Sequence, residues 1–172
     1  MRLLIYLLLP LLFIGCSTKY PELKTVQKVN IDKYLGSWYE IARYEHLFEK
    51  GCTNVKATYS LSQDNDYINV LNECTKEGKK TVAKGVAYAK DESNSKLKVS
   101  FFRPFYGNYW VLMLGDDYEY ALIGEPSREY LWILARKSRI NATLKDKIIN
   151  ELTKLGYTKD KLIWTKHNKK NR

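Results

Sequence analysis

Residues 34–44 read YLGSWYEIARY, a turn that leads directly into a strand-like segment. Gly36 permits a tight backbone bend, and Trp38 places a large, rigid apolar side chain at the first strand position. The alternation from Trp38 to Tyr44 is typical of a β-strand. On its own, the pattern also fits a turn followed by an ordinary core tryptophan, so the rest of the chain has to decide between the two interpretations.

Seven more strand-like segments follow the first, separated by turns rich in Asp, Asn, Ser and Gly. The eight predicted strands span residues 38–44, 53–61, 67–75, 82–90, 96–102, 108–114, 118–124 and 130–137. Sequential, hairpin-length links favour an up-and-down antiparallel sheet, and eight strands without a partner sheet favour closure into a barrel. The predicted class is therefore all-β, an eight-stranded antiparallel up-and-down barrel. Two flat sheets packed as a sandwich are the alternative.

One C-terminal helix is predicted after the last strand, packed outside the barrel. Asn141 or Thr143 can cap its start, and Gly156 ends it at the C′ position. The apolar residues between these positions form a single stripe at helical spacing. A membrane-surface helix is the alternative. Residues 130–137 argue against it, because this strand is apolar on both faces and needs a cover outside as well as an interior.

The first 15 residues have the pattern of an export signal. Arg2 supplies a positive charge, and residues 3–14 form an apolar run that is shorter than the roughly 20 residues of a transmembrane helix. The run ends in LFIGC, residues 12–16, which resembles the lipobox of bacterial lipoproteins. The resemblance implies a lipoprotein signal peptide over residues 1–15 and lipidation of Cys16. An ordinary cleaved signal with an incidental cysteine is the alternative.

Two further cysteines, Cys52 and Cys74, favour a disulfide. An exported domain meets an oxidising environment, where a disulfide is the default state of paired cysteines. The turn between the second and third strands is centred on residue 63, and each cysteine lies 11 residues from it, so the two face each other across the hairpin. A reactive thiol is the alternative, but His46 is six residues from Cys52 and lies in a charged loop.

The formal net charge of the chain is +10, and basic residues crowd its C-terminal end. Nucleic-acid binding is the first interpretation of such a balance. An exported lipoprotein meets no nucleic acid, however, and acidic residues are interspersed among the basic ones. A solvated surface explains the charge best. Weak attraction to anionic lipid is the second explanation, since each basic residue near an anionic membrane contributes ~1 kcal/mol.

Three segments together resemble the signature regions of the lipocalins: Gly36-Ser37-Trp38, Asp116-Asp117-Tyr118, and Arg136 at the end of the last strand. Residues 34–164 resemble the bacterial outer-membrane lipocalins almost from end to end. The resemblance implies a lipocalin (calycin) barrel over residues 31–166, a lipidated tether over 16–30 and a basic tail over 167–172. Chain order brings the signature residues to the closed end of such a barrel, as a structural cluster without a catalytic role. These residues are Gly36, Trp38, Asp117, Tyr118 and Arg136.

Strand alternation, anchored on Trp38 and Arg136 at the closed end, predicts which side chains face inward. The strands 82–90 and 108–114 are ambiguous. In the first, the small residues Gly85, Ala87 and Ala89 are placed inside because a cavity requires missing volume. In the second, Tyr109, Val111 and Met113 are placed inside. The predicted ligand-binding residues are Ala42, Tyr44, Phe48, Val55, Ala57, Tyr59, Phe101, Tyr109, Val111, Tyr130 and Trp132.

An apolar and aromatic lining with phenol hydroxyls suits an acyl chain and a polar head. With the lipocalin resemblance, it predicts binding or carriage of fatty acids or (lyso)phospholipids, for storage, transport or maintenance of envelope lipids. An envelope lipoprotein without a specific ligand is the alternative, because a packed core has the same composition. Neither an enzyme nor a cofactor or metal site is predicted, since His46 and His167 fit no Ser–His–Asp arrangement or metal-ligand spacing. The oligomeric state is left open.

Ser17, rather than Asp, follows the lipobox cysteine, which in bacterial lipoproteins favours the outer membrane, here on its periplasmic face. Several acyl chains on Cys16 anchor a protein firmly, since each buried methylene contributes ~0.8 kcal/mol. Cys16→Ser is therefore expected to move the exported protein to the soluble periplasmic fraction, measured by cell fractionation. Wild-type protein that is itself found in the soluble fraction contradicts the lipid anchor.

Overall fold

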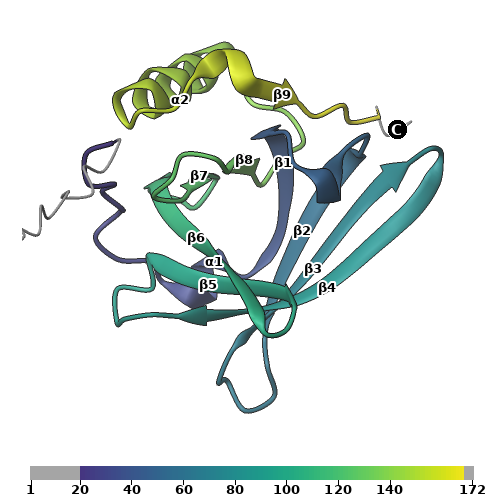
Figure 1. Cartoon of the computed structure of the whole chain (residues 1–172), viewed down its shortest axis with the longest axis vertical. Helices are drawn as coiled ribbons and strands as arrows, with labels where there is room; N and C mark the ends of the chain where they lie inside the picture. The colour runs from purple at the N-terminus through teal and green to yellow at the C-terminus, as the bar shows by residue number, and fades with distance from the viewer. Residues whose placement is uncertain (1–19, 169–172) are drawn as a thin grey trace, which may run out of the picture.

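Eight antiparallel strands close into a barrel in the computed structural model, which describes residues 20–168 (Figure 1). Each strand pairs with the next along the chain, and β1 pairs with both β8 and β2, which closes the sheet. The eight barrel strands are β1 (Gly36–Tyr44), β2 (Thr53–Leu61), β3 (Ile68–Lys76), β4 (Lys79–Ala89), β5 (Lys96–Phe102), β6 (Phe105–Leu114), β7 (Tyr120–Gly124) and β8 (Leu131–Ala135). A short ninth strand, β9 (Leu162–Trp164), pairs with β1. The helical segments are α1 (Ile31–Tyr34), η1 (Leu47–Glu49), α2 (Ala142–Lys154) and η2 (Lys159–Lys161). The predicted signal peptide and Cys16 lie outside the described residues.

The strand bounds follow the alternation in the sequence closely. β2 and β5 begin and end at the predicted residues, and α2 is capped by Asn141, whose side chain accepts a hydrogen bond from the backbone N–H of Leu144 at 2.8 Å. β4 begins earlier than predicted, because Glu77 and Gly78 take positive φ angles of 51° and 74° and make a tight hairpin. The fold is therefore the one that the sequence predicts, an all-β barrel with one helix outside.

Trp38 and Arg136 seal one end of the barrel. Trp38 is fully buried, and the guanidinium carbon of Arg136 lies 3.9 Å from the centroid of its ring. The guanidinium also donates hydrogen bonds to the backbone oxygens of Lys33 at 2.7 Å and Ser37 at 2.9 Å, which tie α1 across the base. The Arg136 Nε donates to the backbone oxygen of Tyr118 at 3.2 Å. The structure thus brings the signature residues together at the closed end.

Two further signature positions lie at the margin of this cluster. Gly36 has a φ of +88°, which a residue with a side chain rarely adopts, and it starts β1 directly beside the Arg136 guanidinium. Asp117 is exposed in the turn between β6 and β7. The opposite end of the barrel, where β1 ends and β2 begins, is the mouth.

Helix α2 packs on the outer face of the barrel over β7 and β8 (Figure 1). Ile148 and Leu152 of the helix are fully buried, in one cluster with Leu131 and Ile133 of β8. The opposite face of β8 contributes Leu134 to the interior, so the strand is covered on both sides, as its sequence predicts. None of the helices among residues 20–168 is long and apolar enough to cross a membrane.

The C-terminal segment completes the barrel wall between β1 and β2. β1 pairs with β2 only as far as Tyr39, after which β9 takes the place of β2 beside Ala42 to Tyr44. Beyond β9, the backbone oxygen of Lys166 accepts from the N–H of Asn54 at 2.8 Å, and a ring nitrogen of His167 lies 2.6 Å from the backbone oxygen of Glu40. His167, which the sequence assigned to a basic tail, is therefore part of the barrel wall.

A disulfide joins Cys52, just before β2, to Cys74 in β3, with their Cα atoms 5.6 Å apart. The two cysteines face each other across the hairpin, as their spacing predicts. Cross-links that close loops of this length restrict the unfolded chain and contribute roughly 3 kcal/mol. The bridge therefore holds the mouth ends of two neighbouring strands together.

Arg136→Ala is expected to lower the free energy of unfolding by about 2–4 kcal/mol, because it removes the contact with Trp38 and several backbone hydrogen bonds at once. Arg139→Ala, at an exposed position shortly after β8, is the control and is expected to change stability by less than about 0.5 kcal/mol. Urea denaturation measures both. Equal effects of the two substitutions would show that Arg136 does not hold the base.

Candidate ligand-binding site

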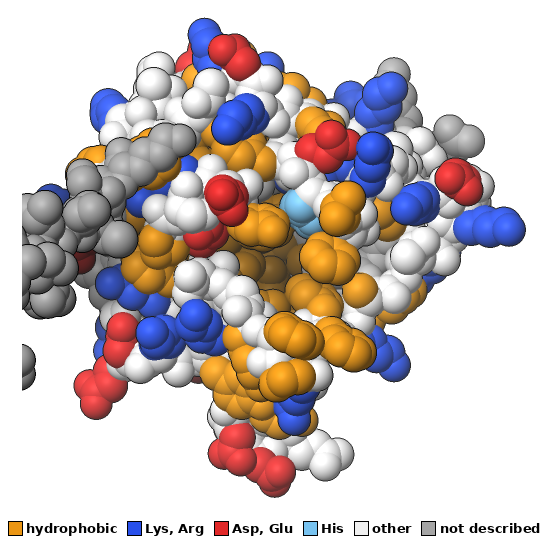
Figure 2. All heavy atoms as spheres, viewed as in Figure 1, with side chains coloured by type: hydrophobic (Ala, Val, Ile, Leu, Met, Phe, Trp, Pro, Cys, Tyr) orange, Lys and Arg blue, Asp and Glu red, His pale blue; other side chains and the backbone are white. Residues whose placement is uncertain are grey.

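The mouth of the barrel is hollowed. Figure 2, drawn from the same side as Figure 1, shows hydrophobic side chains gathered around a central depression. The inner wall is formed by the cluster that includes Ala57, Val70, Ala87, Leu97 and Val111. Val99 and Trp132 pack against this cluster and are only partly buried. These two residues therefore lie where the packed base gives way to the hollow.

Three tyrosines join inside the barrel toward its closed end. The hydroxyl of Tyr109 lies 2.7 Å from that of Tyr34 and 2.9 Å from that of Tyr59. Burial raises the pKa of Tyr59 to about 12, and it raises the pKa of Tyr34 and of Tyr109 well above the usual value. The three hydroxyls are therefore neutral at physiological pH. They hold three protons and use two in these bonds, so the triad keeps donor capacity for a polar group.

Five of the eleven predicted lining residues belong to the interior cluster or pack against it. Ala57, Tyr59, Tyr109 and Val111 belong to the inner cluster, with Trp132 packed against it. Ala87 is fully buried in the same cluster, which agrees with the placement of the small residues of β4 inside.

Four further lining residues lie near the mouth, and all of them except Val55 are exposed. Phe101 packs across Gly85, where an added Cβ would lie 2.8 Å from its ring. Tyr130 is 40% exposed and stacks on Trp132, with the ring centroids 6.0 Å apart. Phe48 is 88% exposed at the rim, and Val55 is buried near the start of β2. The structure therefore places these four residues around the mouth rather than deep inside.

Ala42 and Tyr44 do not face the interior, and this prediction was wrong. Both belong to the outer cluster beneath α2, and the Tyr44 hydroxyl donates to the backbone oxygen of Thr158 at 2.8 Å. The pairing of β1 with β8 shifts by one residue between Glu40 and Ala42. This bulge reverses the alternation beyond it, because side chains of a strand change faces with every residue. A second shift, between Val111 and Met113, turns Met113 outward for the same reason.

The bulge in β1 brings Arg43 into the interior beside Glu40, a pairing that the alternation pattern missed. Glu40 and Arg43 are each 2% exposed, and the Arg43 Nη1 donates to the Glu40 carboxylate at 2.7 Å. Arg43 also donates to the backbone oxygen of Glu49 at 2.7 Å, and Thr165 donates to Glu40. Glu40 and Arg43 are three residues apart, so they would lie on opposite faces of a regular strand and share a face only across a bulge. This acid–base spacing was the signal in the sequence that could have indicated the pair.

The loop after β1 adds polar groups to this pair. The Trp132 Nε1 donates to the Glu49 carboxylate at 3.2 Å, and the His46 Nε2 lies 2.9 Å from the same carboxylate. The buried Arg43 Nε, His46 Nδ1 and Asn72 Oδ1 have no hydrogen-bond partner among the described residues. A buried polar atom without a partner is costly, so these atoms favour a polar ligand or water beside them.

Burial raises the pKa of Glu40 to about 7, and the nearby charge of Glu49 adds to the rise, whereas Thr165 and Arg43 oppose it. Burial also opposes ionisation of Glu49, but the hydrogen bond and charge of His46 and the hydrogen bond from Trp132 hold its pKa below the usual value. Glu49 is therefore the ionised member of the cluster at neutral pH, and Glu40 is the member that titrates there.

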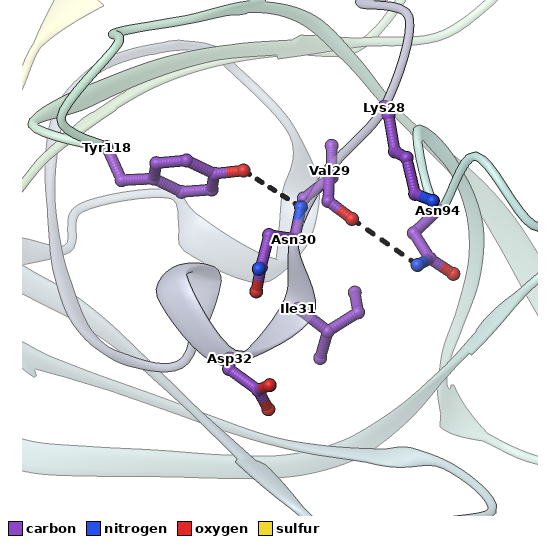
Figure 3. Close-up of a pocket in the computed structure, with 7 residues that line it drawn as sticks. All are labelled: Lys28, Val29, Asn30, Ile31, Asp32, Asn94 and Tyr118. Atoms are coloured by element: carbon purple, nitrogen blue, oxygen red, sulfur yellow. Dashed lines mark hydrogen bonds between the residues drawn. The ribbon is translucent and has the colours of Figure 1, made fainter.

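A second pocket, of about 540 Å³, lies at the closed end beneath the segment that enters α1 (Figure 3). Its polar groups already serve the fold: the Tyr118 hydroxyl accepts from the backbone N–H of Asn30 at 2.8 Å, and Asn94 donates to the backbone oxygen of Val29 at 3.3 Å. Among residues 20–168, no three His, Cys, Asp or Glu side chains are arranged to hold a metal ion.

The barrel, its sealed base and its hollow mouth agree with comparisons to known proteins. A family model described as a lipocalin-like domain matches residues 29–167. The chain is a lipocalin. This lipocalin is 42% identical over 160 residues to the outer membrane lipoprotein Blc of Citrobacter freundii, covering 90% of each chain. It is 40% identical over 158 residues to the protein of the same name from Escherichia coli K12, covering 89% of each.

Solved structures confirm the fold of this lipocalin. Insecticyanin from the tobacco hornworm Manduca sexta is 21% identical, and the likeness covers 87% of both chains with a TM-score of 0.70. The names of the bacterial relatives, together with the predicted lipid anchor, place this lipocalin in the bacterial outer membrane. Lipocalins are binding proteins for small hydrophobic molecules. The hollow and the polar cluster at its mouth are therefore the candidate binding site.

The raised pKa of Glu40 makes the stability of the lipocalin depend on pH. The folded state holds the Glu40 proton up to a pKa of about 7, whereas the unfolded chain releases it near 4.5, so the free energy of unfolding falls as the pH rises between these values. Relative to Glu40→Gln, the wild type is expected to lose on the order of 1–3 kcal/mol across this range. Denaturation at a series of pH values measures the difference. Parallel profiles for the two proteins would contradict the assignment.

Proposed function

We propose that this lipocalin binds a fatty acid or a (lyso)phospholipid, with the acyl chain inside the barrel. The observation that carries the proposal is the hollow mouth lined by hydrophobic side chains above a sealed base (Figure 2). Displacing water from an apolar lining favours methylene groups by roughly 25 cal/mol per Å² buried, less the ordering of the ligand. A single opening makes an elongated ligand enter end-on.

The polar groups of the interior suit the head of such a lipid. Arg43 and His46 lie near the mouth and carry nitrogen atoms without hydrogen-bond partners among the described residues. Arg43 Nε is a donor for a phosphate or carboxylate oxygen, while Glu49 balances its charge at a distance of 3.7 Å. In this arrangement the acyl chain points toward the tyrosine triad and the head group stays at the mouth.

Storage, transport or maintenance of envelope lipids is the role that fits an outer-membrane lipocalin with this site. Catalysis is not part of the proposal, because the charged side chains at the mouth form no nucleophile–base arrangement. An envelope lipoprotein that acts through its surface, without a specific ligand, is the second candidate. The hydrophobic side chains exposed around the mouth favour this second candidate, because they offer a surface for contacts outside the barrel.

Affinity is expected to rise with acyl-chain length, by roughly twofold to fourfold per methylene, until the hollow is full. Titration of delipidated protein with fatty acids and lysophospholipids of graded length measures this. Trp132, at the wall of the hollow, is expected to report binding by its fluorescence. Absence of saturable binding, or affinity that is indifferent to chain length, would support the second candidate.

Val99→Trp fills the hollow from the inner face of β5 and is expected to weaken binding by at least about tenfold, measured by calorimetry. Lys98→Trp adds the same side chain on the opposite face of β5 and serves as the matched control. Unfolding curves establish that both variants are folded. If the two variants bind equally well, the ligand does not occupy the barrel.

A further inference from the structure

Large hydrophobic side chains are exposed on three loops at the mouth and nearly encircle it. The side chains of Leu47 and Phe48 in η1 are 86% and 88% exposed, and those of Phe102 and Phe105 in the β5–β6 hairpin are 76% and 70% exposed. Figure 2 shows hydrophobic side chains at the edge of the hollow. These six residues are called the mouth rim: Leu47, Phe48, Phe102, Phe105, Tyr106 and Tyr130. Contiguous apolar surface of this kind marks an interaction site.

A ligand inside the barrel does not explain why the side chains of the mouth rim are exposed. Phe102 and Phe105 stack on each other, with ring centroids 6.3 Å apart and an interplanar angle of 9°, at the tip of their hairpin. Leu47 and Phe48 project from η1 while their neighbour Glu49 turns into the charged cluster. A ligand inside the barrel would cover the inner side of the rim and leave the outward tips in contact with water.

The N-terminal segment meets the barrel at the same end as the mouth rim. The guanidinium of Arg128, in the loop between β7 and β8, lies 5.2 Å from the ring centroid of Tyr20 and donates to the backbone oxygen of Pro21 at 2.8 Å. Cys16 precedes Tyr20 by four residues, which span at most roughly 14 Å when fully extended. The predicted acyl anchor on Cys16 would therefore attach within roughly 14 Å of Tyr20, at the mouth end of the barrel.

Cations accompany the hydrophobic side chains of the rim. Lys50 directly follows η1, and Arg103 lies between the two phenylalanines of the hairpin, where its Nη2 donates to the Tyr88 hydroxyl at 2.9 Å. Aromatic side chains beside basic ones are the composition of surfaces that sit at the boundary between lipid head groups and acyl chains. A cation near an anionic lipid surface strengthens the attraction of the protein to that surface.

We propose that the mouth rim is a membrane-docking surface, which inserts into the lipid leaflet that carries the Cys16 anchor and faces the barrel mouth toward the bilayer. A lipid then passes between the leaflet and the barrel without crossing water. Docking does not depend on the identity of the ligand. It adds a second contact with the membrane, made by the fold, to the contact made by the acyl anchor.

The test uses the full-length lipidated protein in vesicles of phosphatidylethanolamine and phosphatidylglycerol with brominated acyl chains, which quench tryptophan at short range. Leu47→Trp places a reporter in the mouth rim. Gln63→Trp places the matched control in the exposed β2–β3 turn at the closed end. Wild-type fluorescence is subtracted from both. Because inserted side chains reach the acyl boundary, quenching at position 47 is expected to be at least about twofold greater than at position 63.

A second variant separates docking from ligand binding. Phe102→Asp combined with Phe105→Asp makes the neighbouring hairpin acidic and is expected to abolish the excess quenching at position 47, while calorimetric affinity for a soluble lysophospholipid stays unchanged. Excess quenching that survives these substitutions would come from a brominated lipid inside the barrel and would overturn the docking proposal. Equal quenching at positions 47 and 63 would also overturn the docking proposal. A second copy of the chain that covers the mouth rim would give this result, because it would keep position 47 away from the brominated lipid.

Discussion

The guanidinium of Arg136 over the ring of Trp38 closes the base of the barrel, and the rest of the molecule depends on that closure. A sheet of eight strands that joins its own edges is a tube with two ends, and a cation stacked on a buried aromatic ring, with α1 tied across it, seals one of them. Because Trp38 lies near the start of β1 and Arg136 directly follows β8, the same contact fixes how β1 and β8 pair. The result is a barrel with one opening, in which polarity changes with depth: hydrophobic side chains and tyrosines pack toward the base, and a charged cluster lies at the mouth.

Much of this arrangement can be predicted from the sequence. Alternation and turn residues give eight strands with bounds close to those observed, and a strand that is apolar on both faces predicts the outer helix before any contact is known. The disulfide follows from two cysteines placed symmetrically about a hairpin. These features are local, or follow from chain order in an up-and-down barrel, so a period of two and the positions of turns are sufficient to find them.

The rest could not be predicted because it depends on bulges and on chain segments that meet only in the folded barrel. One extra residue in β1 turns Ala42 and Tyr44 toward α2 and carries Arg43 inward beside Glu40, which no count of alternating positions reveals. The segment from β9 to His167 fills a gap that opens only because β2 leaves β1 after Tyr39, so His167, which reads as the start of a basic tail, lies in the barrel wall. The polar cluster at the mouth is a product of both irregularities, since Glu40 contacts Thr165 as well as Arg43.

In the proposed function, the sealed barrel holds one acyl chain with its head group at the charged mouth. Native mass spectrometry of the full-length protein, gently extracted from bacterial outer membranes, tests it most directly, because denaturation separates a bound lipid from the covalent anchor. One non-covalent acyl lipid per chain, released on denaturation, is expected. Protein that leaves the membrane with its covalent acyl groups alone, and acquires no lipid when lysophospholipid is supplied, would contradict it.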